Sequence, residues 1–124
     1  MKGPHALRAV IIAAAKEFNA RRYFEAHEVL EDGLEAVPDE LWDLFLGLIQ
    51  IAVAYHKLTQ RRWGGAARMF ELGLQKAERF PADAAGVHLE ALRQRVRRDL
   101  AALHAGDFDA AELARRPPRL QPCA

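Results

Sequence analysis

Phe24-Glu25-Ala26-His27-Glu28-Val29-Leu30-Glu31 is the stretch around which the rest of this sequence is organised. An α-helix turns by about 100° per residue, so positions three and four apart share one face. This periodicity puts His27 on the apolar stripe with Leu30. Glu31 lies at the border of that stripe, within reach of both His27 and Glu28. The stretch therefore predicts a helix that carries ionisable side chains toward the core.

The acidic side chains of this region have no basic neighbours in sequence. Between Glu25 and Asp43 the chain holds eight carboxylates and neither Lys nor Arg. A carboxylate that is buried in the folded protein must therefore be balanced by a group from another part of the chain. That group can be a proton, a His, an Arg or a metal ion.

Length and composition indicate one globular domain. The chain has 124 residues, of which 51% are hydrophobic and 28% charged, and its formal net charge is +1. A chain of this length can bury a core without disulfides or a structural metal. The single Cys123 excludes an intramolecular disulfide and favours a reducing compartment, so we expect a cytoplasmic protein.

Two apolar runs bear on targeting. The run at residues 9–15 is about as long as a signal core, but Lys16 and Glu17 continue its helical pattern into the domain. The run from Leu44 to Tyr55 has twelve residues, which is too short to span a bilayer. We therefore expect no membrane association, and we interpret residues 44–55 as a buried central helix.

Apolar periodicity predicts an all-α fold with about five to six helices in a single domain. The helices are expected to pack as antiparallel hairpins, with a tetratricopeptide-like arrangement as one option. They cover residues 5–19, 22–36, 39–60, 65–79, 84–104 and 108–114. Asp39 and Asp83 are expected N-caps, and Gly106 is expected just after a helix end. The domain is assigned to residues 1–114, and residues 115–124 are expected to form an irregular tail.

An internal similarity appears when the sequence is shifted by forty residues. Residues 21–34 then align with residues 61–74, with six identities and an aromatic residue at both Tyr23 and Trp63. A weaker third copy begins at Gly106. Each copy has a turn, an aromatic residue and a small residue before an apolar stripe, which is typical of stacked helical hairpins. Shared helical composition is the alternative explanation.

The sequence contains three motifs in series: residues 24–31 quoted above, then Gly47-Leu48-Ile49-Gln50-Ile51-Ala52-Val53-Ala54-Tyr55-His56, then Gly65-Ala66. Together they resemble the signatures of a small bacterial and archaeal family that is known only as domain-of-unknown-function family 309. The resemblance covers about residues 15–80, which is roughly half of the chain.

This resemblance implies a compact multi-helical fold with no assigned activity. It also draws attention to the positions that match His27, Glu28, Glu31 and Gln50. Two positions depart from the family pattern: Leu34 stands where the family usually has Trp, and Arg61-Arg62 stands where it tends to have Gly-Asn. The loss of the Trp weakens any transfer of ligand preference from the family.

His27, Glu28, Glu31 and Gln50 form the candidate polar site. One hypothesis is a divalent metal or acid/base site at His27, Glu28 and Glu31, because imidazole and carboxylate groups ligate metals and transfer protons. The spacing is not that of zinc peptidases, although Glu28 and Glu31 match the paired carboxylates of helical magnesium-dependent pyrophosphatases. The alternative is a structural hydrogen-bond pair of His27 and Glu31 with Gln50, and no cofactor.

Gln50 is the only polar residue in an otherwise apolar run, so its amide needs a hydrogen-bond partner in the folded protein. We expect that partner on the preceding helix, beside His27 and Glu31. His56 lies about 120° around the helix from Gln50, and we expect it to be partly exposed near the helix end.

A basic cluster follows in the fifth predicted helix. It consists of Arg93, Arg95, Arg97 and Arg98, and Arg115, Arg116 and Arg119 come later. Such a cluster can bind phosphate, but acidic residues interrupt it and no aromatic residue is interleaved. We interpret it as a solvated face and expect no nucleic-acid partner, with weak nucleic-acid binding kept as an alternative.

Three functional hypotheses therefore remain. The first is an interaction module that binds a protein or peptide through a concave helical face. The second is a small metal-dependent, hydrolase-like enzyme that uses the His/Glu cluster. The third is weak nucleic-acid binding through Arg93–Arg98. A homodimer is a further option, because helical hairpins often pair their exposed apolar faces.

Overall fold

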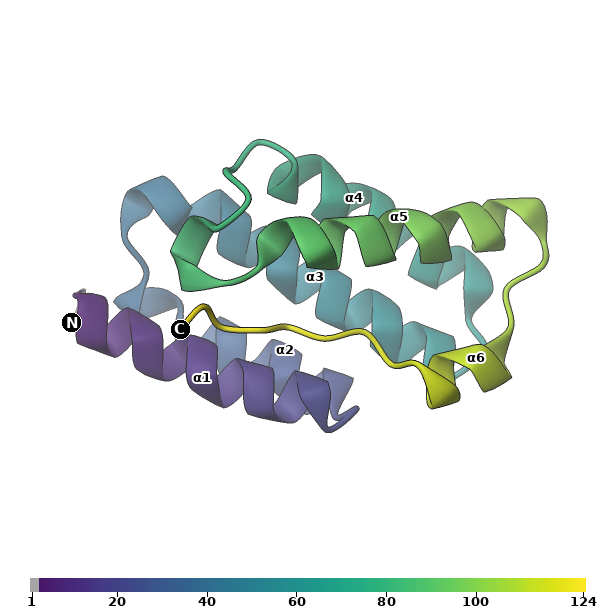
Figure 1. Ribbon diagram of the computed structural model, residues 1–124, viewed down its shortest axis with the longest axis horizontal. Coiled ribbons are helices and arrows are strands. Elements are labelled where there is room, and N and C mark those ends of the chain that lie inside the picture. The colour runs from purple at the N-terminus through teal and green to yellow at the C-terminus, as the bar shows by residue number, and fades with distance from the viewer. Residues whose placement is uncertain (1–2) are drawn as a thin grey trace.

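The fold is all-α, as predicted, in the computed structural model, which describes residues 3–124 (Figure 1). Within these residues six α-helices pack against their neighbours: α1 (Pro4–Asn19), α2 (Tyr23–Asp32), α3 (Trp42–Thr59), α4 (Trp63–Ala77), α5 (Leu89–Ala105) and α6 (Ala110–Arg115). The 3₁₀ turns are η1 (Leu34–Ala36), η2 (Asp39–Leu41) and η3 (Ala84–Gly86). The predicted domain begins at residue 1, and residues 1 and 2 lie outside the described part.

α3 is the central helix of the bundle. It packs against α2 and against α4. Leu44, Phe45 and Tyr55 on this helix are fully buried. A helix that is apolar around most of its circumference is stable in water only when neighbours cover several of its sides. The interpretation of residues 44–55 as a buried central helix is therefore confirmed.

By length and composition, the segment Asp39–Thr59 could also cross a membrane. Half of its most apolar window is buried inside the fold, as is usual for a core helix that passes the same test. Length and hydropathy alone are therefore weak support for a membrane span.

α3 and α4 approach closely where Gly47 faces Gly73. A Cβ atom on Gly73 would lie 2.8 Å from the Gly47 carbonyl oxygen and 2.8 Å from Ile51 Cγ1. A Cβ atom on Gly47 would lie 3.0 Å from the Gly73 carbonyl oxygen. Real side chains do not pack at such distances, so glycine at both positions permits this interhelical approach.

The turn between α1 and α2 is a Schellman motif. The Arg21 N–H donates to the Phe18 carbonyl oxygen at 3.0 Å, and the Arg22 N–H donates to the Glu17 carbonyl oxygen at 2.9 Å. These are the two bonds that satisfy the last carbonyls of a helix in this motif. The turn between α3 and α4 repeats both bonds forty residues later, so the internal similarity is also a structural repeat of this turn.

The residue after the helix end adopts a left-handed conformation in all three inter-helix turns of this type. Arg21 has φ of 66°, Arg61 has φ of 59° and Gly106 has φ of 74°. The prediction of Gly106 at this position is confirmed. Glycine adopts this conformation without a steric penalty. An arginine can adopt it only at a steric cost, because it has a Cβ atom.

The second and third predicted helices differ from the structure at their junction. α2 ends at Asp32, and residues 34–36 form η1 instead of a further helical turn. Val37 is extended, as the residue before Pro38 tends to be. Asp39 was expected to cap the next helix, but it lies in η2 and the N-cap of α3 is Leu41.

The later helices also begin at other residues than predicted. α4 spans Trp63–Ala77, so it starts and ends two residues earlier than expected. α5 begins only at Leu89, because Ala85 and Gly86 have positive φ and Val87 is extended. Asp83 therefore precedes η3 rather than a helix. α6 begins at Ala110, where the Asp109 side chain accepts the Ala111 N–H at 2.9 Å.

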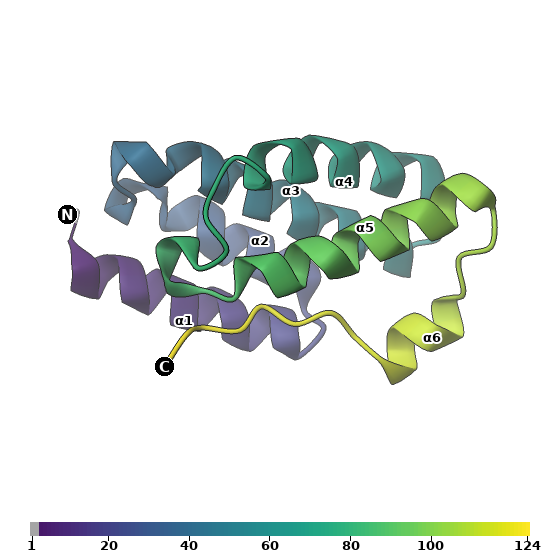
Figure 2. The ribbon, with the colours of Figure 1, turned by 45° about the horizontal axis from the view of Figure 1, so that its top comes forward.

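The C-terminal segment, residues 116–124, is irregular and packs onto the domain. It runs between α1 and α5 (Figures 1 and 2). Leu120 is only 3% exposed and belongs to the hydrophobic core. The segment thus covers apolar surface that a six-helix domain would otherwise leave open.

Candidate functional site

His27 and Glu31 form the predicted pair, but at the surface of α2. His27 Nε2 lies 3.1 Å from Glu31 Oε2, and His27 Nδ1 lies 2.7 Å from the Phe24 carbonyl oxygen. The Glu31 side chain is 59% exposed and that of His27 is 17% exposed. Because water reaches the carboxylate, the buried pair expected from the apolar stripe is replaced by a surface pair. The Phe24 ring lies against His27 and against His56.

Gln50 does not join this pair. Its Oε1 atom accepts a hydrogen bond from Lys76 Nζ of α4 at 2.9 Å. The prediction that the hydrogen-bond partner of Gln50 lies on the preceding helix is therefore wrong. The physical reason is the close approach of α3 and α4 at Gly47, one helical turn before Gln50, which places this face of α3 against α4.

The three proposed metal ligands do not converge. Glu28 is exposed and stands outside the pair that His27 forms with Glu31. Within residues 3–124 no group of three or more His, Cys, Asp or Glu side chains is close enough to hold a metal ion. The donor set at this position is thus one imidazole and one exposed carboxylate.

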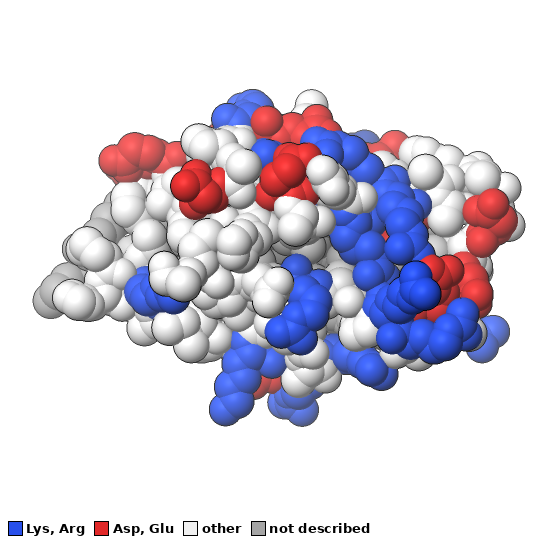
Figure 3. Space-filling view, viewed as in Figure 1, with Lys and Arg blue, Asp and Glu red and all other residues white. Residues whose placement is uncertain are grey.

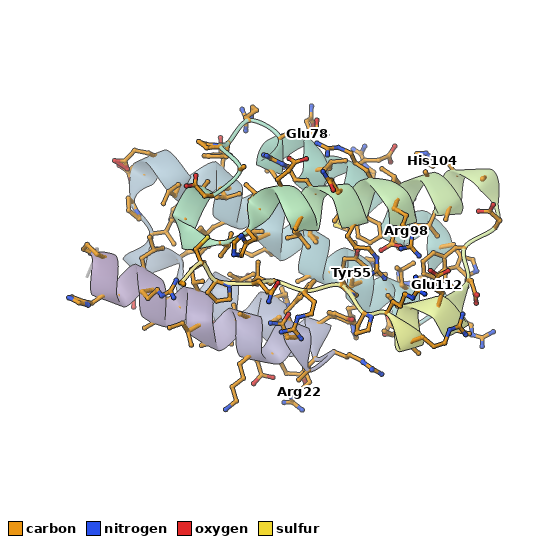
Figure 4. The ribbon with its side chains drawn as sticks, viewed as in Figure 1. Arg22, Tyr55, Glu78, Arg98, His104 and Glu112 are labelled. Carbon is orange, nitrogen blue, oxygen red and sulfur yellow. The ribbon has the colours of Figure 1, made fainter. Side chains whose placement is uncertain are left out.

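The basic cluster of α5 is engaged in intramolecular contacts. Arg97 contacts Glu78 and Glu90, and Arg98 pairs with Glu112 of α6, toward which it points in Figure 4. Basic side chains are prominent on this face over α5 and the C-terminal region, with acidic side chains beside them (Figure 3). The interpretation as a solvated face describes Arg97 and Arg98 but does not describe Arg93, which is buried.

Arg93 connects α5 to the end of α4. Its Nη1 atom donates to the carbonyl oxygens of Ala77 at 2.8 Å and Phe80 at 2.6 Å. Its Nη2 atom lies 2.7 Å from Glu90 Oε1. The arginine therefore satisfies carbonyl groups that the end of a helix leaves without partners. Hydrogen bonding from Arg93 is the main reason why the pKa of Glu90 is lowered.

A buried polar network links α3 to α5. The Tyr55 hydroxyl donates to Asp99 Oδ2 at 2.6 Å, and Arg95 Nε donates to the same oxygen at 2.9 Å. Burial raises the pKa of Tyr55 well above its usual value, and the charge of Asp99 adds to this effect. The sequence did not single out this network, although Arg95 and Asp99 have the spacing of a helical ion pair.

A cavity lies between the start of α2, the end of α3 and α6. Its volume is about 260 Å³. Its walls include the two left-handed turn residues, Arg21 and Arg61, together with Tyr23. α6 contributes Leu113. The repeated turn thus brings two arginines that are forty residues apart in sequence to one cavity.

Tyr23 carries an unpaired hydroxyl in this region. The residue is 3% exposed, and its hydroxyl oxygen is buried without a hydrogen-bond partner among the described residues. Burial raises the pKa of Tyr23 to about 12, against opposing effects of Arg21 and Arg95. The hydroxyl therefore remains protonated and can act as a hydrogen-bond donor at neutral pH.

A comparison with known protein families finds a match to part of the chain. Residues 11–69 match the domain of unknown function DUF309. The chain contains a DUF309 domain. No curated protein matches the chain. The resemblance drawn from the motifs is therefore confirmed, and DUF309 carries no assigned function.

The DUF309 domain supplies only part of each candidate site. Arg21, Tyr23 and Arg61 lie within residues 11–69, whereas α6, which closes the cavity, lies outside them. Asn19, which contacts the C-terminal segment, also lies inside the DUF309 domain. Residues after position 69 therefore supply the remaining wall of the cavity and the contact partner of Asn19.

Proposed function

We propose that this protein is a peptide-binding helical module, acting in the cytoplasm, whose groove lies between α1 and α5. The C-terminal segment occupies this groove as an intramolecular ligand. The single observation that carries the proposal is the two-way contact between Asn19 and Leu120. Asn19 Nδ2 donates to the Leu120 carbonyl oxygen at 3.0 Å, and the Leu120 N–H donates to Asn19 Oδ1 at 2.8 Å.

This contact has the form of peptide recognition. An amide side chain that binds both main-chain groups of one residue fixes an extended segment without reading its sequence. The buried Leu120 side chain then supplies preference for an apolar residue at the same position. A main-chain clamp combined with a side-chain pocket is how grooves select extended ligands.

Further main-chain contacts continue along the segment. The His88 N–H donates to the Gln121 carbonyl oxygen at 2.8 Å, and the Cys123 N–H donates to the Gly86 carbonyl oxygen at 2.7 Å. Arg8 Nη2 donates to the Cys123 carbonyl oxygen at 2.9 Å. The segment is thus held from both walls of the groove, by α1 and by the start of α5. We infer that the external ligand is an extended peptide with a leucine that has a proline two residues before it and another two residues after it, like this segment.

The proposal is favoured over the two alternatives by side-chain geometry. Metal-dependent chemistry would need converging ligands, and His27, Glu28 and Glu31 do not converge. Nucleic-acid binding through α5 would need free arginines, but Arg93, Arg95, Arg97 and Arg98 contact backbone or carboxylate oxygens of the same chain.

The test compares the full chain with a chain that ends at residue 115, the last residue of α6. Binding of a fluorescent peptide of residues 116–124 is measured by anisotropy. We expect the shortened chain to bind it and the full chain to bind much more weakly, because the tethered segment competes at high effective concentration. Asn19→Ala in the shortened chain, or Leu120→Asp in the peptide, should abolish binding.

A second measurement uses the full chain, so it does not depend on the folding of the shortened one. Cys123 is the only thiol, and its rate of reaction with a thiol reagent reports release of the segment. Asn19→Ala should raise this rate, whereas Lys16→Ala, an exposed change on the same helix, should not. Equal peptide binding by the full and shortened chains, or an unchanged Cys123 rate, would contradict the proposal.

A further inference from the structure

The apolar run at residues 9–15 surrounds α1 completely, although one side of this helix faces solvent. Seven consecutive residues make about two helical turns, so they point in every direction around the axis. Ile11, Ala14 and Ala15 are buried in the domain, whereas Ile12 is 50% exposed, even with the C-terminal segment in place. A helix that is apolar on all sides is normally covered on all sides. The solvent side of α1 therefore has the composition of a contact surface.

A groove runs along this side of the molecule, where α1 and α2 lie next to each other (Figures 1 and 2). Its volume is about 550 Å³. α1 contributes Ala6, Ala9, Val10 and Ala13, and α2 contributes Val29. From Ala6 to Ala13 the groove follows α1 for about 10 Å, which is about two helical turns. These short side chains leave room for the larger apolar side chains of a ligand.

The two charged residues that line the groove are both acidic. Asp32 ends α2, and Glu35 belongs to η1. Glu28 lies one helical turn before Asp32, so an acidic edge continues along α2. All three side chains are exposed, and none of them has an ion-pair partner in the part of the chain that the structure describes. The groove thus combines an apolar floor with an acidic edge, and its ligand should carry cations beside apolar groups.

The backbone of the groove walls indicates the conformation of the ligand. α1 and α2 pair their main-chain groups within each helix, so the walls offer few main-chain partners. An extended peptide would leave its own N–H and C=O groups without partners there, whereas a helix satisfies them internally. Packing of a helix against two neighbouring helices, with apolar side chains three and four positions apart, is a common mode of recognition.

A second copy of this chain does not offer such a helix. The exposed large hydrophobic side chains within residues 3–124 are Ile12, Phe24, Trp42 and Trp63, and they lie on four different helices. Each helix therefore presents only one of them, whereas a groove of about two turns accommodates two or more. The helix that fits this groove belongs to another protein.

We propose that the groove between α1 and α2 binds an amphipathic α-helix of a partner protein. Large apolar side chains of this helix pack against Ala9 and Ala13, and its lysine or arginine side chains lie beside Asp32 and Glu35. The site is distinct from the peptide groove, because Arg8 and Asn19, which hold the C-terminal segment on α1, do not line it.

The experiment measures binding of three fluorescent peptides to the full chain by anisotropy. Each has about 18 residues, enough to form a helix. The first has leucines along one face and lysines along one edge of that face. The second has glutamate in place of each lysine, and the third is the lysine peptide with a central proline. We expect saturable one-to-one binding of the lysine peptide, with a gain of helix by circular dichroism, and at least about tenfold weaker binding of the other two.

Variants at exposed positions test the proposed contacts without disturbing the core. Asp32→Asn with Glu35→Gln removes the acidic charges and should weaken binding of the lysine peptide about fivefold. Glu40→Gln with Asp83→Asn removes the same charge outside the groove and is the matched control, which should bind as the unmodified chain does. Ala13→Gln places a larger polar side chain on the groove floor at little cost to the helix, and should weaken binding by about tenfold or more.

Four results would overturn the proposal. They are no saturable binding of the lysine peptide, equal binding of the lysine and glutamate peptides, equal effects of the groove variants and the matched control, and a dimer of the full chain in sedimentation that Ala13→Gln dissociates. The last result would identify a second copy as the occupant. Asn19→Ala, which acts on the C-terminal segment, should bind the lysine peptide normally, so failure of one proposal is distinguishable from failure of the other.

Discussion

At the scale of single residues, Arg21 and Arg61 have a left-handed backbone conformation that glycine adopts more easily than arginine. Arg61 has φ of 59°, while the next residue, Arg62, has φ of −94°. A glycine substitution should therefore change the free energy of unfolding in opposite directions at Arg61 and Arg62.

Arg61→Gly should raise the free energy of unfolding by ~0.5–1 kcal/mol, because removing the strain outweighs the larger entropy of the unfolded glycine chain. Arg62→Gly should lower it by a similar amount, since no strain is relieved there. Urea unfolding of both variants measures the difference. If the two glycine variants are equally stable, the left-handed strain at Arg61 is not significant.

Arg93 is the charged residue on which the packing of α5 against α4 depends. Arg93→Met keeps the apolar stem but leaves the Ala77 and Phe80 carbonyl oxygens without this donor. We expect a loss of about 3 kcal/mol in the free energy of unfolding. Arg97→Met on the same helix removes only exposed ion pairs and should cost less than about 1 kcal/mol. Similar losses in both variants would contradict the assigned role of Arg93.

At the scale of helices, glycine serves two different purposes in α4. Gly73 permits the close approach to α3, whereas a Cβ atom on Gly64 would meet nothing within 4 Å. Helix propensity alone predicts that alanine stabilises both positions by up to about 1 kcal/mol. The structure predicts instead that alanine stabilises the fold at Gly64 and destabilises it at Gly73.

Gly73→Ala should lower the free energy of unfolding by about 2–3 kcal/mol, because its Cβ atom forces α3 and α4 apart. Gly64→Ala should raise it by up to about 1 kcal/mol through helix propensity. Thermal unfolding of both variants, with circular dichroism to verify helix content, measures these effects. A stabilised Gly73→Ala would show that the interhelical contact adjusts without cost.

At the scale of the whole molecule, α1, α3 and α5 meet around buried tyrosines. Tyr23 packs against Phe18 and against Tyr55, at ring centroid distances of 5.1 and 5.5 Å. Tyr55 in turn reaches α5 through Asp99. Ionisation of these rings is therefore coupled to unfolding of the domain.

Stability should fall as the pH rises above about 10. Tyrosines in the unfolded chain lose their protons near pH 10, whereas the pKa of Tyr23 is raised to about 12 and that of Tyr55 well above 10. Between these values the unfolded state binds fewer protons, so the free energy of unfolding decreases with pH by up to about 1.4 kcal/mol per pH unit for each tyrosine.

Urea unfolding between pH 9 and pH 11.5 tests this dependence, with Tyr23→Phe as the comparison. The variant should lose less stability over the range, because one of the two groups no longer titrates. Parallel pH profiles of the variant and the unmodified chain would show that Tyr23 ionises equally in both states.

The sequence by itself determined the helical class, the buried central helix and the resemblance of part of the chain to DUF309. Apolar spacing and local turn residues are sufficient for these, since they depend on contacts within one helix or one turn. A pair of His27 with Glu31, four residues apart on one helix, was one of the two alternatives that it offered for these side chains. The position of Gly106 is another local property.

Only the tertiary structure decided which polar groups meet. Gln50 contacts Lys76, Tyr55 contacts Asp99, and Asn19 contacts Leu120, all across long separations in sequence. Such contacts depend on how helices approach and rotate against one another, which periodicity within a single helix does not specify. For the same reason, the convergence of Arg21 and Arg61 on one cavity could be seen only in the folded chain.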